Sequence, residues 1–256
     1  MKNRYFALCV AFSLLLTSCA PSAAPTGNPV ATTPVATTAA APAANGANLD
    51  AIKAYLVTKI AALKTSTTTL KAASDQYFAL AQAANFDYAT LWAKQPKEVT
   101  KALQDAKTNW MAASPLYEQM EGIVAGTPSL AQFDIDLDAG ISVAEGSEDV
   151  VSFDIKLPNG KVLSKPGNLF GVTESALWGT YPEYDVADVE PDFNGDGKIE
   201  FGEALPDANL LKGSVDLLDS KVGELAAAAA PWQPTATEAF GALIGNVPTV
   251  SDFFDS

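Results

Sequence analysis

Histidine is absent from the 256 residues of this chain, and basic residues are scarce, with 16 Lys and Arg against 30 Asp and Glu. Without imidazole the chain has no Ser-His-Asp triad, no HExxH zinc site and no histidine general base. The formal net charge of −14 opposes binding to nucleic acid and attracts cations. Acidity also keeps exported proteins soluble, so charge alone does not assign a function.

Cysteine is nearly absent too, and its two occurrences lie near the N-terminus. A basic start precedes an apolar run over residues 5–16, which is too short to span a bilayer and is typical of a secretory signal peptide. The run ends in LTSC, which resembles the lipobox of bacterial lipoproteins. We therefore expect residues 1–18 to be removed and Cys19 to carry the lipid of a membrane anchor. The alternative is an ordinary cleaved signal that leaves Cys19 free.

A chain that loses Cys9 and acylates Cys19 has no free thiol, which excludes disulfides and thiolate metal sites. Any metal would need oxygen ligands, which favour hard cations. Residues 19–47 consist mainly of Pro, Ala and Thr without charge and are predicted to form an extended tether. Residues 48–256 are long enough for one domain with its own core.

Apolar residues recur at helical spacing after Asn48 or Asp50, which can cap a first helix. The Thr65–Thr69 run either ends this helix or lies within a longer one. Pro96 marks the boundary of a further helix, and Pro115 should kink it. Helical patterns return over 169–178, 208–230 and 235–243.

The central region, about 126–168, has a different pattern. Ser152–Ile155 and Lys161–Leu163 alternate apolar and polar residues around a Pro-Asn-Gly turn, so they can pair as a small β-hairpin. We predict a mainly α fold, a helical bundle with an irregular central region.

The stretch DFNGDGKIEFGE, residues 192–203, has the ligand spacing of a calcium-binding EF-hand loop, with Gly197 at the sharp turn. Glu200 would act through water. A solvated acidic turn is the alternative. The predicted Ca²⁺ ligands are the side chains of Asp192, Asn194, Asp196 and Glu203 and the backbone carbonyl of Lys198.

Prolines surround this loop where the helices of a calcium sensor would stand. Pro182 and Pro191 precede it and Pro206 follows soon after. A sensor needs two flanking helices that swing apart, so we predict a static calcium clip instead.

Two further segments place carboxylates in helical patterns. Glu118 and Glu121 are three residues apart, so they share one helix face. Glu174 lies in an apolar helical stretch, where burial of an unpaired carboxylate is costly. Carboxylates directed into a bundle core form the kind of oxygen site that bundles use for metals. The alternative is that Glu118 and Glu121 are solvated and Glu174 lies at the edge of the core.

A second acidic run has the same first spacing as the calcium-type loop, through Asp134, Asp136 and Asp138. It carries Ala139 where the turn glycine belongs, so it is a weak calcium motif. An acidic helix terminus is the alternative.

Two short motifs contain these glutamates: Trp110, Tyr117, Glu118 and Glu121 form one, and Phe170, Glu174, Leu177 and Trp178 form the other. In these motifs the sequence resembles the imelysin family, which includes EfeO-type periplasmic iron-uptake proteins and imelysin-like lipoproteins. The resemblance implies a helical domain that binds metal, takes part in iron uptake or homeostasis and works with iron-transport components. It makes Glu118, Glu121 and Glu174 candidate ligands of iron or another hard cation.

One departure from the family pattern bears on the chemistry. The histidine of the family's HxxE motif falls at Gly171, so only Glu174 of that pair is kept. This disfavours peptidase activity and weakens metal binding at that position. Relative to the family pattern, residues 181–206 resemble an insertion that contains the calcium-type loop.

These observations predict an exported lipoprotein of the bacterial cell envelope that binds metal without catalysis and holds a structural Ca²⁺. Two alternatives stay open. One is a calcium-stabilised binding or structural module without an iron role. The other is a metallopeptidase, which the absence of histidine disfavours because catalytic zinc normally has imidazole ligands.

Overall fold

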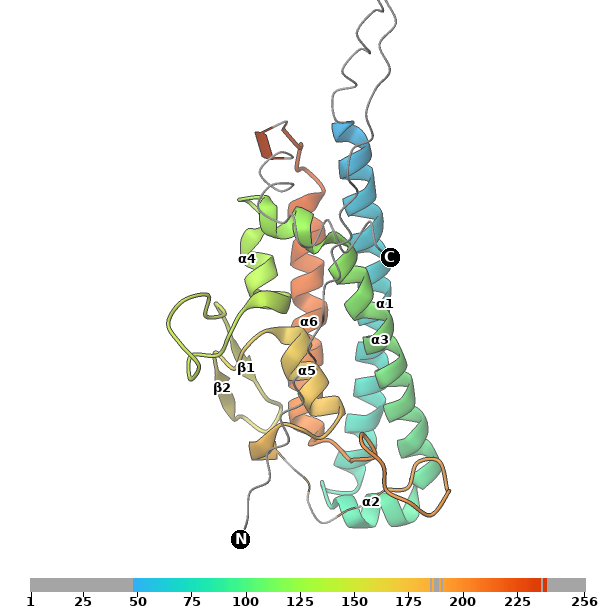
Figure 1. The fold of residues 1–256 in the computed structure, drawn as a ribbon. Helices are drawn as coiled ribbons and strands as arrows, with labels where there is room; N and C mark the ends of the chain where they lie inside the picture. The colour runs from blue at the N-terminus through green and yellow to red at the C-terminus, as the bar shows by residue number, and fades with distance from the viewer. Residues whose placement is uncertain (1–47, 185, 187–188, 190, 236, 239–256) are drawn as a thin grey trace, which may run out of the picture. The chain divides into compact units, whose positions relative to one another are not determined.

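Long helices dominate the part of the chain that the structure describes (Figure 1), which confirms the predicted mainly α bundle. No helix in this part is long and apolar enough to cross a membrane. The predictions for the signal peptide, the tether, Cys19 and the helix beyond residue 238 lie outside the described residues. The structure, a computed structural model, describes residues 48–184, 186, 189, 191–235 and 237–238.

The first helix, α1, is continuous over Leu49–Ala83, so the longer of the two predicted alternatives is correct. Asn48 caps it, since its side-chain oxygen accepts a first-turn N–H at 3.1 Å. The threonine run does not break the helix because its hydroxyls find partners. Those of Thr65 and Thr69 donate to carbonyl oxygens one turn earlier, at 3.0 Å each. Between them, the hydroxyls of Thr67 and Thr68 donate to the carboxylate of Asp219, which lies on the helix over residues 208–229.

A short helix, α2 (Tyr88–Lys94), leads into the long α3 (Pro96–Gly126). Pro96 stands in the first turn of α3, where its missing N–H costs no helical hydrogen bond, as the sequence predicted. Pro115 lies inside α3, and the helix continues past it for more than two turns.

Four helices pack in a ring that encloses the core. α1 packs against α3 and α6 (Ala208–Ala229), and α5 (Leu169–Leu177) packs against α6 and α3 on the other side. Figure 1 shows α5 lying in front of α6 in this view. Each helix turns an apolar stripe inward, as the spacing predicted. Fully buried members include Leu56, Leu63 and Tyr77 of α1, Leu103, Tyr117 and Val124 of α3, Leu177 of α5, and Leu211, Leu218 and Leu225 of α6.

The central region combines helical turns with a hairpin. α4 (Ala131–Asp134) runs directly into a π-helical turn, η1 (Ile135–Ala139), which packs against α5 and α6. The strands β1 (Asp154–Lys156) and β2 (Val162–Ser164) are antiparallel, so the predicted hairpin is confirmed with boundaries moved by one or two residues.

The π-helical turn is fixed by a buried carboxylate. Asp136 is only 1% exposed and is also paired with Lys221 of α6, at 3.3 Å. A buried charge is tolerated when its oxygens are satisfied in this way. Its hydrogen-bond donors are the backbone N–H of Ser152 at 2.9 Å, the Ser152 hydroxyl at 2.8 Å and the Gln132 amide at 3.1 Å.

Replacing this carboxylate should destabilise the domain. We expect Asp136→Ala to lower the free energy of unfolding by about 3 kcal/mol, because it leaves the Ser152 donors without their partner and removes one of the two carboxylates that pair with Lys221. Urea denaturation measures the change. The matched control is Asp105→Ala, which removes only an exposed i,i+4 pair with Lys101 and should cost less than about 1 kcal/mol. Equal effects of the two substitutions would contradict the anchoring role.

Candidate metal centre

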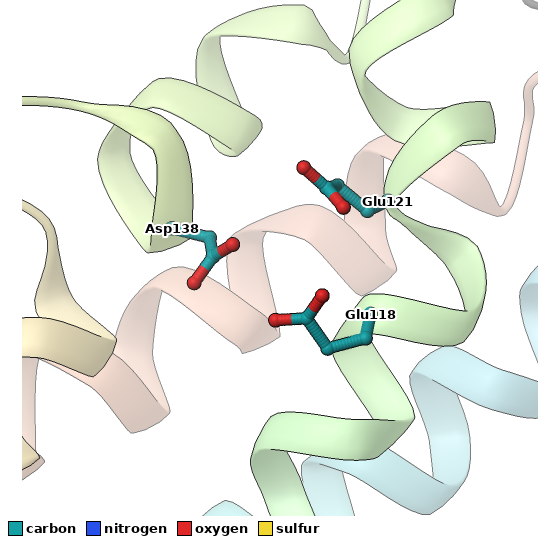
Figure 2. Close-up of side chains that lie close together, drawn as sticks. All are labelled: Glu118, Glu121 and Asp138. Carbon is teal, nitrogen blue, oxygen red and sulfur yellow. The ribbon is translucent and has the colours of Figure 1, made fainter. Parts of the chain in front are cut away.

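Three carboxylates from two elements meet beside the bundle. Glu118 and Glu121 come from adjacent turns of α3, and Asp138 comes from the π-helical turn η1 (Figure 2). One oxygen from each of them lies within 4.8 Å of the others. Figure 2 shows the Glu118 and Asp138 side chains directed toward each other across the gap between α3 and η1. We call these three residues the carboxylate cluster.

The chain around the cluster explains how it is held. Tyr117 is fully buried in α3, and its hydroxyl donates to Oδ1 of Asp134 at 2.8 Å, which ties the end of α4 to α3. Asp138 follows Asp134 by four residues, so the two lie on the same side of this helical segment. Asp136 lies between them in sequence and makes its contacts with Ser152 and Lys221 instead. π-Helical turns are rare and often occur at functional sites.

Mutual repulsion and burial both disfavour charge in the cluster. Burial, with added repulsion from Asp134, Asp138 and Glu118, raises the pKa of Glu121 to about 7. Burial and the neighbouring carboxylates likewise raise the pKa of Asp138 to about 6. The pKa of Asp134 is also raised by burial, although the Tyr117 hydroxyl partly opposes this. The site therefore favours a proton or another cation.

The cluster lacks an internal counter-ion in the described part of the chain. None of the ion pairs or hydrogen bonds among those residues involves the carboxylates of Glu118, Glu121 or Asp138. Asp136, by contrast, is paired with a lysine. Glu118 is exposed and the other two are half-buried, so a cation can reach the cluster from solvent. Three carboxylates near one point, without a protein cation, fit a hard metal ion.

The structure brings together only part of the predicted ligand set. Glu118 and Glu121 meet as expected, but Glu174 is exposed on α5 and is not in the cluster. The inward position expected for Glu174 is therefore not observed. The reason is helical phase, since the buried arc of α5 is centred on Leu169, Thr173 and Ala176, and Glu174 lies beyond the edge of that arc.

Asp138 is the member that the sequence reasoning missed as a ligand. Its acidic run, 134–138, was compared with a calcium loop and is instead helical, in agreement with the acidic helix alternative. Its spacing from Asp134 is the available signal, because two carboxylates four residues apart share a helix face.

Gly171 stands where the family pattern has histidine. Its N–H donates to Oδ1 of Asn168 at 2.7 Å, so it belongs to the capped first turn of α5. A Cβ atom at this position would lie 3.0 Å from the same Oδ1, so a side chain would press on the cap. No imidazole ligand is available here.

The 192–203 loop is a separate acidic feature, and its side chains bind its own backbone. Asp192 accepts the N–H groups of Gly195 and Gly197 at 2.6 and 2.8 Å, and these bonds lower the pKa of Asp192. Glu203 folds back across the loop and accepts the N–H groups of Phe193 and Glu200, at 2.9 Å each. The two ends of the loop are thus held together through Glu203.

Short segments, not helices, adjoin this loop in the described residues. The 3₁₀ turn η2 (Pro182–Tyr184) is the nearest preceding element, and α6 begins at Ala208. Gly195 and Gly197 both have positive φ angles, as a tight acidic loop requires. This setting agrees with a fixed loop more than with a pair of moving helices.

By its fold and site, the chain is a helical-bundle protein that holds a cluster of carboxylates between two helical segments, α3 and η1. A family model described as imelysin, peptidase M75, matches residues 49–250. The chain therefore belongs to the imelysin family, and the resemblance seen in the sequence is confirmed. Neither the comparison with curated proteins nor that with solved structures gives a match.

The raised pKa values predict an unusual pH dependence of stability. Because the folded chain holds the Glu121 proton up to about pH 7 and the unfolded chain releases it near 4.5, metal-free protein should lose stability as pH rises between these values. Glu121→Gln removes this loss. We expect the variant to be about 1 to 2 kcal/mol more stable than wild type at pH 8, allowing for solvent screening, and nearly equal at pH 4.

The measurement is urea denaturation of both proteins in a chelating buffer at the two pH values. A Glu121→Gln variant that is less stable at pH 8 would contradict the electrostatic account of the cluster.

Proposed function

We propose that this imelysin-family protein binds a hard cation at the carboxylate cluster and serves iron uptake or homeostasis in the cell envelope without catalysis. The observation that carries the proposal is the convergence of Glu118, Glu121 and Asp138 without a counter-ion among the described residues. When all three carboxylates are ionised, their total charge of −3 balances the +3 charge of a ferric ion. Carboxylates are also suitable ligands for such a hard ion.

The partial exposure of the cluster suits a cargo that must enter and leave. A structural site is usually closed, whereas three ligands at a solvent-facing position leave coordination places for water or for a carrier molecule. The raised carboxyl pKa values add a release route, because protons compete with the metal at mildly acidic pH.

The remaining parts of the proposal concern calcium and the membrane. The 192–203 loop would bind Ca²⁺ as a static clip, through Asp192, Asn194, Asp196, the carbonyl of Lys198 and Glu203. Its support is the ligand spacing together with the folded loop, in which Asp192, Asn194 and Glu203 accept N–H groups of the loop's own backbone. A lipid on Cys19 would anchor the protein in the bacterial envelope, and iron-transport components would be its partners.

Binding of the hard cation can be tested directly. We expect protein dialysed against ferric citrate at pH 7.5 to retain about one iron per chain, because the three carboxylates then compete well with protons. The combined change Glu121→Gln and Asp138→Asn should abolish retention, measured as bound iron by mass spectrometry. All samples carry Asp192→Ala, so that the 192–203 loop does not contribute.

The matched control is Glu174→Gln, which removes an exposed carboxylate of α5 outside the cluster and should leave iron retention unchanged. Loss of iron with Glu174→Gln but not with the double variant would contradict the assignment to α3 and η1. Absence of iron from these samples, together with calcium binding by wild-type protein, would favour the calcium-stabilised module without an iron role.

Calcium binding to the loop is a separate prediction. We expect isothermal titration of wild-type protein with CaCl₂ to show one site, and Asp192→Ala to weaken it by more than about tenfold, or roughly 1.4 kcal/mol. Asp149→Ala, on another exposed loop, is the control and should bind like wild type. Identical titrations of wild type and Asp192→Ala would reject the loop as the calcium site.

A further inference from the structure

One lysine of the bundle reaches the 192–203 loop at both of its ends. Lys107 lies in the middle of α3, and its ammonium group donates a hydrogen bond to the backbone carbonyl of Gly202. The same nitrogen lies 5.2 Å from the ring centre of Phe193, within range of a cation–π interaction. Phe193 directly follows the first predicted ligand, and Gly202 directly precedes the last.

Aromatic side chains complete the contact between the loop and the bundle. Phe193 meets Trp92 of α2 edge-on, with ring centres 5.7 Å apart. The Lys107 nitrogen is also 5.5 Å from the ring centre of Trp178, which follows α5. Residues from α2, α3 and the end of α5 therefore contact the loop.

Gly202 permits this close approach. Its φ angle is +87°, a left-handed conformation that favours glycine. A Cβ atom there would lie 2.9 Å from Cδ1 of Trp178, too close for a side chain without movement of the indole. The backbone carbonyl that Lys107 binds is therefore exposed to the bundle because residue 202 has no side chain.

We propose that Lys107 is a positioning residue that holds the two ends of the 192–203 loop against the bundle and so preorganises it for Ca²⁺. It takes the place of the flanking helices that hold an EF-hand loop in other settings. Preorganisation raises affinity because less conformational freedom is lost on binding. The effect of Lys107 on calcium affinity rests on the proposed calcium function of the loop. The effect of Lys107 on the conformation of the metal-free loop does not depend on that function.

The test combines a metal-free and a calcium-bound measurement on purified protein. Lys107→Met keeps most of the side-chain volume and removes the donor and the charge. In a chelating buffer, we expect trypsin to cleave after the exposed Lys198 about fivefold faster than in wild type, because the loop opens more often. In calcium titrations, we expect the Kd to rise about tenfold.

The direction of the calcium effect separates positioning from charge. Loss of an ammonium charge alone would favour a bound cation, so weaker binding by Lys107→Met reports lost positioning. Lys107→Arg keeps a charged donor and should restore most of both properties. Lys156→Met is the control, since it removes an exposed lysine of β1, and it should behave like wild type in both assays.

Each other outcome decides against a specific claim. Unchanged cleavage after Lys198 in Lys107→Met would overturn the positioning role. Faster cleavage with equal or tighter calcium binding would overturn preorganisation of the ion site. Faster cleavage in a protein whose wild-type form binds no calcium would reject the proposed calcium function while Lys107 would still hold the loop. A urea midpoint for Lys107→Met close to that of wild type shows that cleavage reports the loop and not global unfolding.

Discussion

The repulsion among carboxylates at the junction of α3 and η1 is the constraint on which the site depends. Glu118, Glu121 and Asp138 would separate in water, but the fold holds them within 4.8 Å. The Tyr117 hydrogen bond to Asp134 fixes the approach to η1, and the buried Asp136 fixes its opposite side. The free energy cost of this arrangement is relieved by a proton or by a cation, which links protonation, stability and metal binding at one position.

The two acidic features of the chain differ in how their oxygens are satisfied. In the 192–203 loop, Asp192 and Glu203 accept N–H groups of the same loop, and Lys107 ties the loop to the bundle. In the carboxylate cluster, no such donors are present among the described residues. A loop of the first kind can stay folded without an ion. The carboxylate cluster is stabilised more by a bound ion. This difference fits the proposals of a static calcium site in the 192–203 loop and an exchangeable cation at the cluster.

Periodicity in the sequence was sufficient to predict the longer helices, because each buries one apolar stripe against the others, but it did not predict the short α2 and α4. It was not sufficient where partners distant in sequence decide the outcome. The threonine run stays helical partly because Asp219, far along the chain, accepts two of its hydroxyls. Glu118 and Glu121 were found from their spacing on one helix. Asp138 was not, because its approach to α3 depends on the π-helical turn, and the orientation of Glu174 depends on the phase of α5 within the ring.

The most direct test of the central claim is to locate a hard cation in crystals of the protein. Crystals soaked in ferric citrate and measured at the iron absorption edge should show an anomalous peak within coordination distance of oxygens of Glu118, Glu121 and Asp138. The account predicts this peak in wild type, with Glu174 outside its coordination sphere. A peak at Glu174, or iron bound only to the 192–203 loop, would contradict it.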